Sequence, residues 1–107
     1  MARIQQGSVV WADMPAPAGR RPVVVLTRDA AIGRLNALTV GPITRTIRNT
    51  PTEVMLQPSD GVPTACVISL DNIFTIARSE LGKPITVLDR AKMFETFAAI
   101  RHAFDMP

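Results

Sequence analysis

The chain contains one cysteine, one histidine, one tryptophan and no tyrosine in 107 residues. The single cysteine, Cys66, excludes an internal disulfide and a zinc site built from cysteines, and it agrees with a reducing compartment. The single histidine, His102, excludes catalysis by a pair of histidines. Its place near the carboxyl end is typical of a cation at the end of a helix, so we assign it no catalytic role.

Sequence motifs of several large enzyme classes are also missing. There is no GxxxxGK[ST] phosphate loop, no GxGxxG after a strand pattern and no histidine and cysteine cluster with metal-ligand spacing. We therefore expect neither a cofactor nor a metal ion. No apolar run approaches the roughly 18 residues of a membrane-spanning helix, and the amino end has no apolar signal segment. A cytoplasmic protein without a membrane anchor is the expectation.

Lysine is scarce, because ten of the twelve basic residues are arginine and the formal net charge is +3. The planar guanidinium matches phosphate groups and stacks on bases, so this bias favours a nucleic-acid partner. A genome rich in G and C would explain the same bias, and composition leaves both explanations open. The hydrophobic fraction of 47% suggests a subunit interface as well as the core of one domain over residues 1–107.

Short segments rich in β-branched residues follow one another at roughly ten-residue spacing, which is typical of a small barrel or sandwich. The segments are SVVWADM, PVVVLTR, LNALTVGPITRTIR, TEVMLQ, TACVISL and DNIFTIA. The first two are expected to form a hairpin, the second of them buried on both faces. Gly41 and Pro42 predict a bulge or bend, beyond which Thr44, Thr46 and Arg48 would share one face of a continuing strand.

A single long helix is predicted at the carboxyl end, from Thr86 to Phe104. Thr86 is the expected N-cap, with Asp89 three residues later in a capping-box arrangement. An apolar face is expected to pack on the barrel. Its predicted members are Val87, Ala91, Phe94, Phe97, Ala98 and Ile100.

Two pairs of polar residues suggest a phosphate site. Arg20 and Arg21 stand at the start of one strand, and Thr44 and Thr46 follow the predicted bend in another. If these strands are neighbours, guanidinium and hydroxyl groups converge on one concave surface. The alternative, in which Arg21 forms an interface salt bridge and the threonines are ordinary strand residues, stays open on spacing alone. Glu53, inside an apolar strand, is interpreted as structural rather than catalytic.

Three stretches, GSVVWADMPAPAGRRPVVVLT, VGPIT and PTEVMLQPSDGVPTACVISLDNIFTIARSELGK, occur in this order. Together they resemble the MazF/PemK family of bacterial toxin endoribonucleases. The resemblance implies a mainly β (α+β) fold: a CcdB/PemK-like, SH3-like barrel of about five to seven strands with a C-terminal helix. It also implies a homodimer that cleaves single-stranded RNA, mostly mRNA, without metal, so that translation and growth stop. A cognate antitoxin is expected to lay a disordered tail across the RNA groove.

The resemblance also implies roles for individual residues. Arg21, in the Arg-Pro-Val stretch, falls on the catalytic arginine of the family, Thr44 of Pro-Ile-Thr falls on its catalytic threonine or serine, and Asp71 matches an aspartate near the cleaved phosphate. Candidate RNA contacts are Arg20, Arg45, Thr46 and Arg48. The loop before Arg21 is short and lacks the Glu-Gln pair of many members, so the general base stays open between Asp71 and solvent.

Two other functions remain as alternatives. One is a toxin of the same fold that binds DNA gyrase and cuts nothing; such proteins act through a terminal aromatic, whereas this chain ends HAFDMP without tryptophan. The other is a catalytically inactive SH3-like module that only holds an antitoxin or RNA.

Overall fold

The computed structural model describes residues 3–107, and within them it shows seven strands, two α-helices and three single turns of 3-10 helix. The strands are β1 (Ser8–Asp13), β2 (Arg20–Val25), β3 (Ala37–Thr44), β4 (Glu53–Leu56), β5 (Cys66–Ser69), β6 (Phe74–Ala77) and β7 (Leu81–Val87). The α-helices are α1 (Asp29–Ile32) and α2 (Arg90–Ala103). The 3-10 turns span Pro58–Asp60, Leu70–Asn72 and Arg78–Glu80.

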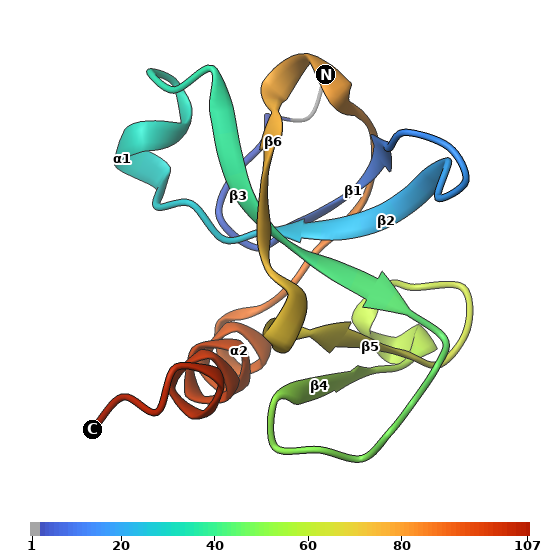
Figure 1. Ribbon diagram of the computed structural model, residues 1–107, viewed down its shortest axis with the longest axis vertical. Coiled ribbons are helices and arrows are strands. Elements are labelled where there is room, and N and C mark those ends of the chain that lie inside the picture. Colours follow the sequence, from blue (N-terminus) through green and yellow to red (C-terminus); the bar gives the residue numbers. More distant parts are fainter. Residues whose placement is uncertain (1–2) are drawn as a thin grey trace.

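All strands belong to one coiled antiparallel sheet. Its order is β4-β5-β3-β2-β1-β7, and β6 pairs with β3 beside this path. The long strand β3 joins the two parts of the molecule: Figure 1 shows it running from β1, β2 and β6 down to β4 and β5. The strand-rich fold with a terminal helix is confirmed. The barrel is open, because no pairing joins β4 to β7 among the described residues.

The central hairpin of β1 and β2 has core on both faces. Val23, Val24 and Val25 are fully buried, as the run of β-branched residues predicted. Val24 packs with Val9 in one apolar cluster, and Val23 and Val25 pack with Val10 in another. This alternation follows from the two-residue period of a strand, and it fixes which side chains of the hairpin face the site described below.

Helix α2 covers the first of these clusters and begins later than predicted. Thr86 lies in β7 opposite Val9, and the true N-cap is Asp89, whose carboxylate accepts the N–H of Lys92 at 2.8 Å. The predicted Thr86 cap is therefore wrong. The β-branched run that ends at Val87 pairs with β1 instead, which adds the strand that sequence periodicity missed.

The apolar face predicted for α2 is wrong for four of its six members, whereas Phe97 and Ile100 are half-buried against the first apolar cluster. The buried residues are Met93, Thr96 and Ala99, whereas Phe94 is 73% exposed. Val87, Ala91 and Ala98 are likewise exposed. Because apolar residues occur on most sides of this helix, its own periodicity does not define the buried face. No described helix has the length and apolar character needed to cross a membrane.

Strand β3 passes through Gly41 and Pro42 without a bulge. These residues lie opposite Val24 and Val23 of β2 in a regular register. The strand ends at Thr44, so the chain beyond it is a loop rather than the continuing strand that was predicted.

Candidate functional site

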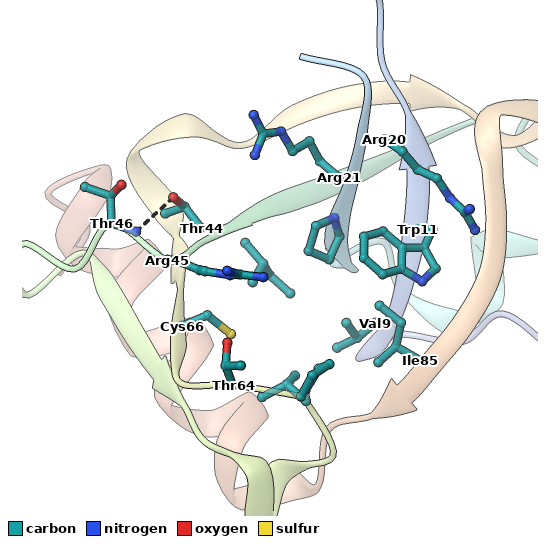
Figure 2. Close-up of a pocket in the computed structure, with 14 residues that line it drawn as sticks. Val9, Trp11, Arg20, Arg21, Thr44, Arg45, Thr46, Thr64, Cys66 and Ile85 are labelled. Atoms are coloured by element: carbon teal, nitrogen blue, oxygen red, sulfur yellow. Dashed lines mark hydrogen bonds between the residues drawn. The ribbon is translucent and has the colours of Figure 1, made fainter.

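A cavity of about 490 Å³ opens where the ends of several strands meet (Figure 2). Strands β1, β2 and β7, the end of β3 with its following loop, and the connection from β4 to β5 all contribute to it. The lining residues are Val9, Trp11, Arg20, Arg21, Pro22, Ile43, Thr44, Arg45, Thr46, Val62, Pro63, Thr64, Cys66 and Ile85.

The lining combines an apolar floor with cationic and hydroxyl groups at the rim. Three arginines and three threonines line it, and no carboxylate does so among the described residues. Such a cavity favours an anion that also carries a flat or apolar part, since guanidinium groups bind phosphate while apolar walls bind rings. A nucleotide segment has this combination of properties.

Arg21 is held by its own loop. Its Nε–H donates to the carbonyl oxygen of Ala18 at 3.0 Å, and no other bond to this guanidinium is found within the described residues. The neighbouring Gly19 adopts φ +64°, where side chains are disfavoured, and its carbonyl accepts the N–H of Met14 at 3.0 Å. The backbone of this short loop therefore orients Arg21 and leaves both Nη groups for a ligand.

Arg20 has a different environment. Its guanidinium carbon lies 5.2 Å from the ring centroid of Trp11, within the range of a cation–π contact. The register of the hairpin places Trp11 opposite Pro22, so Arg20 and Trp11 share one face. In Figure 2 the guanidinium groups of Arg20 and Arg21 point in opposite directions, which assigns them to different parts of the rim.

Thr44 and Thr46 stand at the edge of the cavity opposite Trp11 (Figure 2). The backbone N–H of Thr46 donates to Oγ1 of Thr44 at 3.1 Å. The hydroxyl of Thr44 donates to no other group among the described residues, so its hydrogen is available to a ligand.

The turn after Thr44 carries Arg45 across the hollow, as Figure 2 shows. Below it lies the buried thiol of Cys66. Burial raises the pKa of Cys66, the positive charge of Arg45 acts in the opposite direction, and Asp60 raises the pKa further. The thiol is therefore held in its neutral form, and it forms part of the apolar floor.

The wall formed by residues 62–64 depends on Gly61. This residue has φ +99°, and a Cβ at this position would lie 2.7 Å from the Cβ of Thr86. The hydroxyl of Thr86 donates to the carbonyl of Asp60 at 3.4 Å. Close contact with β7 thus fixes the connection between β4 and β5, which sequence reasoning did not assign to the site.

The structure brings five of the seven predicted site residues to one cavity: Arg20, Arg21, Thr44, Arg45 and Thr46. Arg48 lines a second, adjoining hollow that also includes Thr44 and Thr46. Asp71 lines neither hollow, and its carboxylate accepts the hydroxyl of Thr52 at 2.6 Å. A catalytic role for Asp71 stays a prediction that the geometry does not strengthen.

Two further predictions concern isolated groups. Oε1 of Glu53 accepts the backbone N–H of Arg48 at 3.0 Å and that of Thr50 at 3.5 Å, which supports a structural role for this side chain. His102 is exposed in the last turn of α2 and lines neither hollow. Among residues 3–107, no group of three histidine, cysteine, aspartate or glutamate side chains is placed to hold a metal ion.

Comparison with known families matches residues 5–104 to the model of a PemK-like, MazF-like toxin of type II toxin-antitoxin systems. The chain belongs to this family. Among curated members of the PemK/MazF family, the probable endoribonuclease MazF5 of Mycobacterium tuberculosis is 41% identical over 101 residues, which covers 94% of this chain and 92% of that protein. The probable endoribonuclease MazF2 of the same organism is 40% identical over 86 residues, covering 79% of this chain and 84% of that protein.

Solved structures of PemK/MazF proteins share the fold. The Mycobacterium tuberculosis toxin MazF-mt6 superposes with a TM-score of 0.86 at 34% identity, covering 94% of this chain and 98% of that one. A mycobacterial endoribonuclease in complex with its cognate antitoxin gives a TM-score of 0.86 at 28% identity, covering 99% of this chain and 98% of that one. The expected resemblance is confirmed over nearly the whole chain.

Proposed function

We propose that this chain is the toxin of a type II toxin-antitoxin pair and that it cleaves single-stranded RNA without a metal ion. The observation that carries the proposal is the cavity in which three arginines and the hydroxyl of Thr44 gather over an apolar floor. PemK/MazF relatives described as endoribonucleases support the same chemistry. Action on mRNA agrees with a cytoplasmic location.

The proposed reaction is attack of a ribose 2′-hydroxyl on the adjacent phosphorus. The bond from phosphorus to the 5′-oxygen of the next nucleotide breaks, and the departing 5′-oxygen takes a proton from water, which leaves a 2′,3′-cyclic phosphate and a 5′-hydroxyl. Negative charge develops on the phosphorane oxygens in this step. The free Nη groups of Arg21 and the hydroxyl of Thr44 donate to these oxygens and stabilise the charge in a partly desolvated site.

Proton removal from the 2′-hydroxyl has no carboxylate or imidazole partner among the residues that line the cavity. Arginine is a poor base near neutral pH because its guanidinium group keeps its proton there. We therefore assign this proton to solvent, with the positive charge of Arg21 lowering the energy of the resulting alkoxide. Orientation of Arg21 comes from the Ala18 carbonyl, which accepts its Nε–H at 3.0 Å.

The test is incubation of the protein with a long single-stranded RNA in EDTA. We expect cleavage that leaves 2′,3′-cyclic phosphate ends, and about a 100- to 1000-fold lower rate in Arg21→Ala. Arg34→Ala is the matched control, because Arg34 is exposed and lines neither hollow. Intact RNA with the wild-type protein would contradict the proposal and favour the gyrase-binding or inactive alternatives. Wild-type activity in Arg21→Ala would refute the assigned mechanism.

An antitoxin is the second proposed partner. A solved mycobacterial relative is an endoribonuclease in complex with its cognate antitoxin. Three arginines without a lining carboxylate are complementary to an acidic, disordered tail, which would cover the same cavity as RNA. We expect the cognate antitoxin to compete with RNA for binding, and simultaneous binding of both would contradict this arrangement.

We also propose a homodimer. The exposed face of α2 carries Ala91, Phe94 and Ala98, and Phe94 is 73% exposed. Phe104 and Val87, 57% and 47% exposed, add apolar surface that a monomer would leave in water. Light scattering at micromolar concentration should give twice the mass of the chain, and a monomer would overturn the proposal.

A further inference from the structure

The side chain of Lys92 joins the first turn of α2 to β4 and to the 3-10 turn Pro58–Asp60. Its Nζ donates to the carbonyl oxygen of Met55 at 3.0 Å and lies 3.7 Å from Oδ2 of Asp60. A second carboxylate, that of Glu95, lies 3.5 Å away on α2 itself. The side chains of Lys92 and Asp60 are only 18% and 17% exposed, whereas that of Glu95 is 56% exposed. Solvent therefore screens the pair with Asp60 less than the pair with Glu95.

Asp60 ends the 3-10 turn that leads to the cavity. Its Oδ2, the atom that faces Lys92, also accepts the backbone N–H of Gln57 at 2.8 Å. Its carbonyl oxygen accepts the hydroxyl of Thr86 at 3.4 Å. One carboxylate oxygen thus closes the turn and faces α2, while the main chain of the same residue is bound to β7.

The connection that contains Asp60 has no strand partner. The last pairing between β4 and β5 joins Leu56 to Cys66, so residues 57–65 lie beyond the sheet. Two polar contacts reach this connection from other parts of the described chain, one from Lys92 and one from Thr86, and both end at Asp60. The position of the connection therefore depends on this one residue.

The cavity wall formed by residues 62–64 starts two residues after Asp60. Gly61 lies between them with φ +99°, and its N–H donates to the carbonyl oxygen of Pro58 at 3.0 Å. Val62, Pro63 and Thr64 then line the cavity. A displacement of the turn would thus be transmitted directly to the wall, because no flexible segment separates the two.

We infer that Asp60 and Lys92 are positioning residues, which hold the wall of residues 62–64 and so set the shape of the cavity. Neither residue lines the cavity, whereas Arg21 and Thr44 reach it from β2 and β3. Loss of the ion pair therefore moves the wall and leaves the proposed catalytic groups in place. The effect on RNA rests on the proposed ribonuclease function, to which the inference adds a supporting role for α2.

The kinetic test measures KM and kcat for RNA cleavage by the wild type, Lys92→Met, Lys92→Arg and Glu95→Gln. We expect Lys92→Met to raise KM roughly three- to tenfold and to change kcat less than about twofold, because the wall binds RNA without acting on the phosphate. Lys92→Arg keeps the cation and should stay close to the wild type. Glu95→Gln is the matched control, since it removes the other ion pair of Lys92 and leaves the contact with Asp60.

Asp60→Asn tests the same contact from the side of the turn. The amide oxygen can still accept the N–H of Gln57, so the turn stays closed while the charge is lost. KM should rise by a similar factor, and the double variant with Lys92→Met should be no worse than either single variant. Additive effects on KM would overturn the inference, because two residues that act through one contact do not contribute separately.

The reactivity of Cys66 reports the position of the wall without any RNA. Cys66 follows Thr64 by two residues, and its buried thiol lines the same cavity (Figure 2). The charges that act on the pKa of this thiol belong to Arg45 and Asp60, so Lys92→Met releases the turn without removing either of them. We expect iodoacetamide to alkylate Cys66 roughly three- to tenfold faster in Lys92→Met than in the wild type.

Arg78→Met is the control for a general loss of stability. Nε of Arg78 donates to the carbonyl oxygen of Leu35 at 3.2 Å, and Arg78 lines neither hollow. This variant also exchanges a cation bound to a main-chain carbonyl for methionine. Its Cys66 should react as slowly as that of the wild type, and equal acceleration in Arg78→Met and Lys92→Met would overturn the inference.

The outcomes separate this inference from the proposed function. Cleavage with a wild-type KM in Lys92→Met leaves the ribonuclease proposal intact and overturns the inference, as does unchanged reactivity of Cys66. If the wild type cuts no RNA, the proposed function fails and the reactivity of Cys66 alone decides the inference. If Lys92→Met does not fold, the KM of Asp60→Asn decides it, and a wild-type value would overturn it.

Discussion

Replacing Thr44 with valine tests whether the hydroxyl in the cavity acts on the reacting phosphate. Valine keeps the shape of threonine and removes the O–H donor. Oγ1 of Thr44 accepts the N–H of Thr46 at 3.1 Å and donates to no described residue, so the hydroxyl hydrogen is available to the phosphorane oxygen. Loss of one such donor lowers the rate about 100- to 1000-fold. Thr44→Ser keeps the donor and should stay far closer to the wild type.

Thr44→Val also removes the side-chain oxygen that accepts a hydrogen bond from the backbone of the following loop. The N–H of Thr46 loses its partner, but Thr46 is exposed and water replaces the bond. The free energy of unfolding should therefore fall by about 0.5 to 1.5 kcal/mol, which is a small part of the stability of a domain. A large loss of rate with a small loss of stability is the expected signature.

The assay is single-turnover cleavage of a fluorescent RNA in EDTA, with thermal unfolding measured on the same samples. Thr27→Val is the matched control, because Oγ1 of Thr27 also accepts a backbone N–H, that of Thr39 at 2.8 Å, and Thr27 lines neither hollow. The control should lose at least as much stability, because its hydrogen bond is part-buried, and it should keep the wild-type rate. A folded Thr44→Val protein that cleaves RNA as fast as the control would refute the assigned role of the hydroxyl.

Three further predictions follow from the site. Gly61→Ala should lower the melting temperature, because φ is +99° and the new Cβ would lie 2.7 Å from the Cβ of Thr86; we expect a loss of about 1 to 3 kcal/mol. The logarithm of the cleavage rate should rise linearly with pH if solvent takes the proton, and Asp71→Asn should leave the slope unchanged. Burial raises the pKa of Cys66, so its alkylation at neutral pH should be slower than that of a free thiol. Arg45→Ala should raise this pKa further and slow the reaction again, because the cation favours the thiolate.

Specific results would contradict each of these. Gly33→Ala is the control for Gly61→Ala, because a Cβ at Gly33 meets nothing within 4 Å and φ is −72°. Equal melting temperatures of the two variants would contradict the predicted clash with Thr86. A plateau in the pH–rate profile that disappears in Asp71→Asn would make Asp71 the general base. Faster alkylation of Cys66 after loss of Arg45 would show that exposure, rather than charge, controls the thiol.

The amino-acid sequence by itself determined the class of fold and the main residues of the candidate site. Runs of β-branched residues separated by proline and glycine predict the strands because each run has a strong local preference for the extended chain. The Arg-Pro-Val and Pro-Ile-Thr stretches pointed to Arg21 and Thr44, and the structure places both on one cavity.

Only the tertiary structure decided the features that depend on contact between distant segments. Thr86 and Val87 pair with β1 instead of starting a helix, and α2 buries Met93 rather than Phe94, because neighbouring elements determine which face is covered. The hydrogen bonds from Arg21 to the Ala18 carbonyl and from Asn72 to Ser69 each span only three residues, but they need a turn geometry that residue preferences alone do not specify. Residue preferences act over short stretches of sequence, whereas the pairing of β7 with β1 and the buried face of α2 exist only after segments remote in the chain have come together.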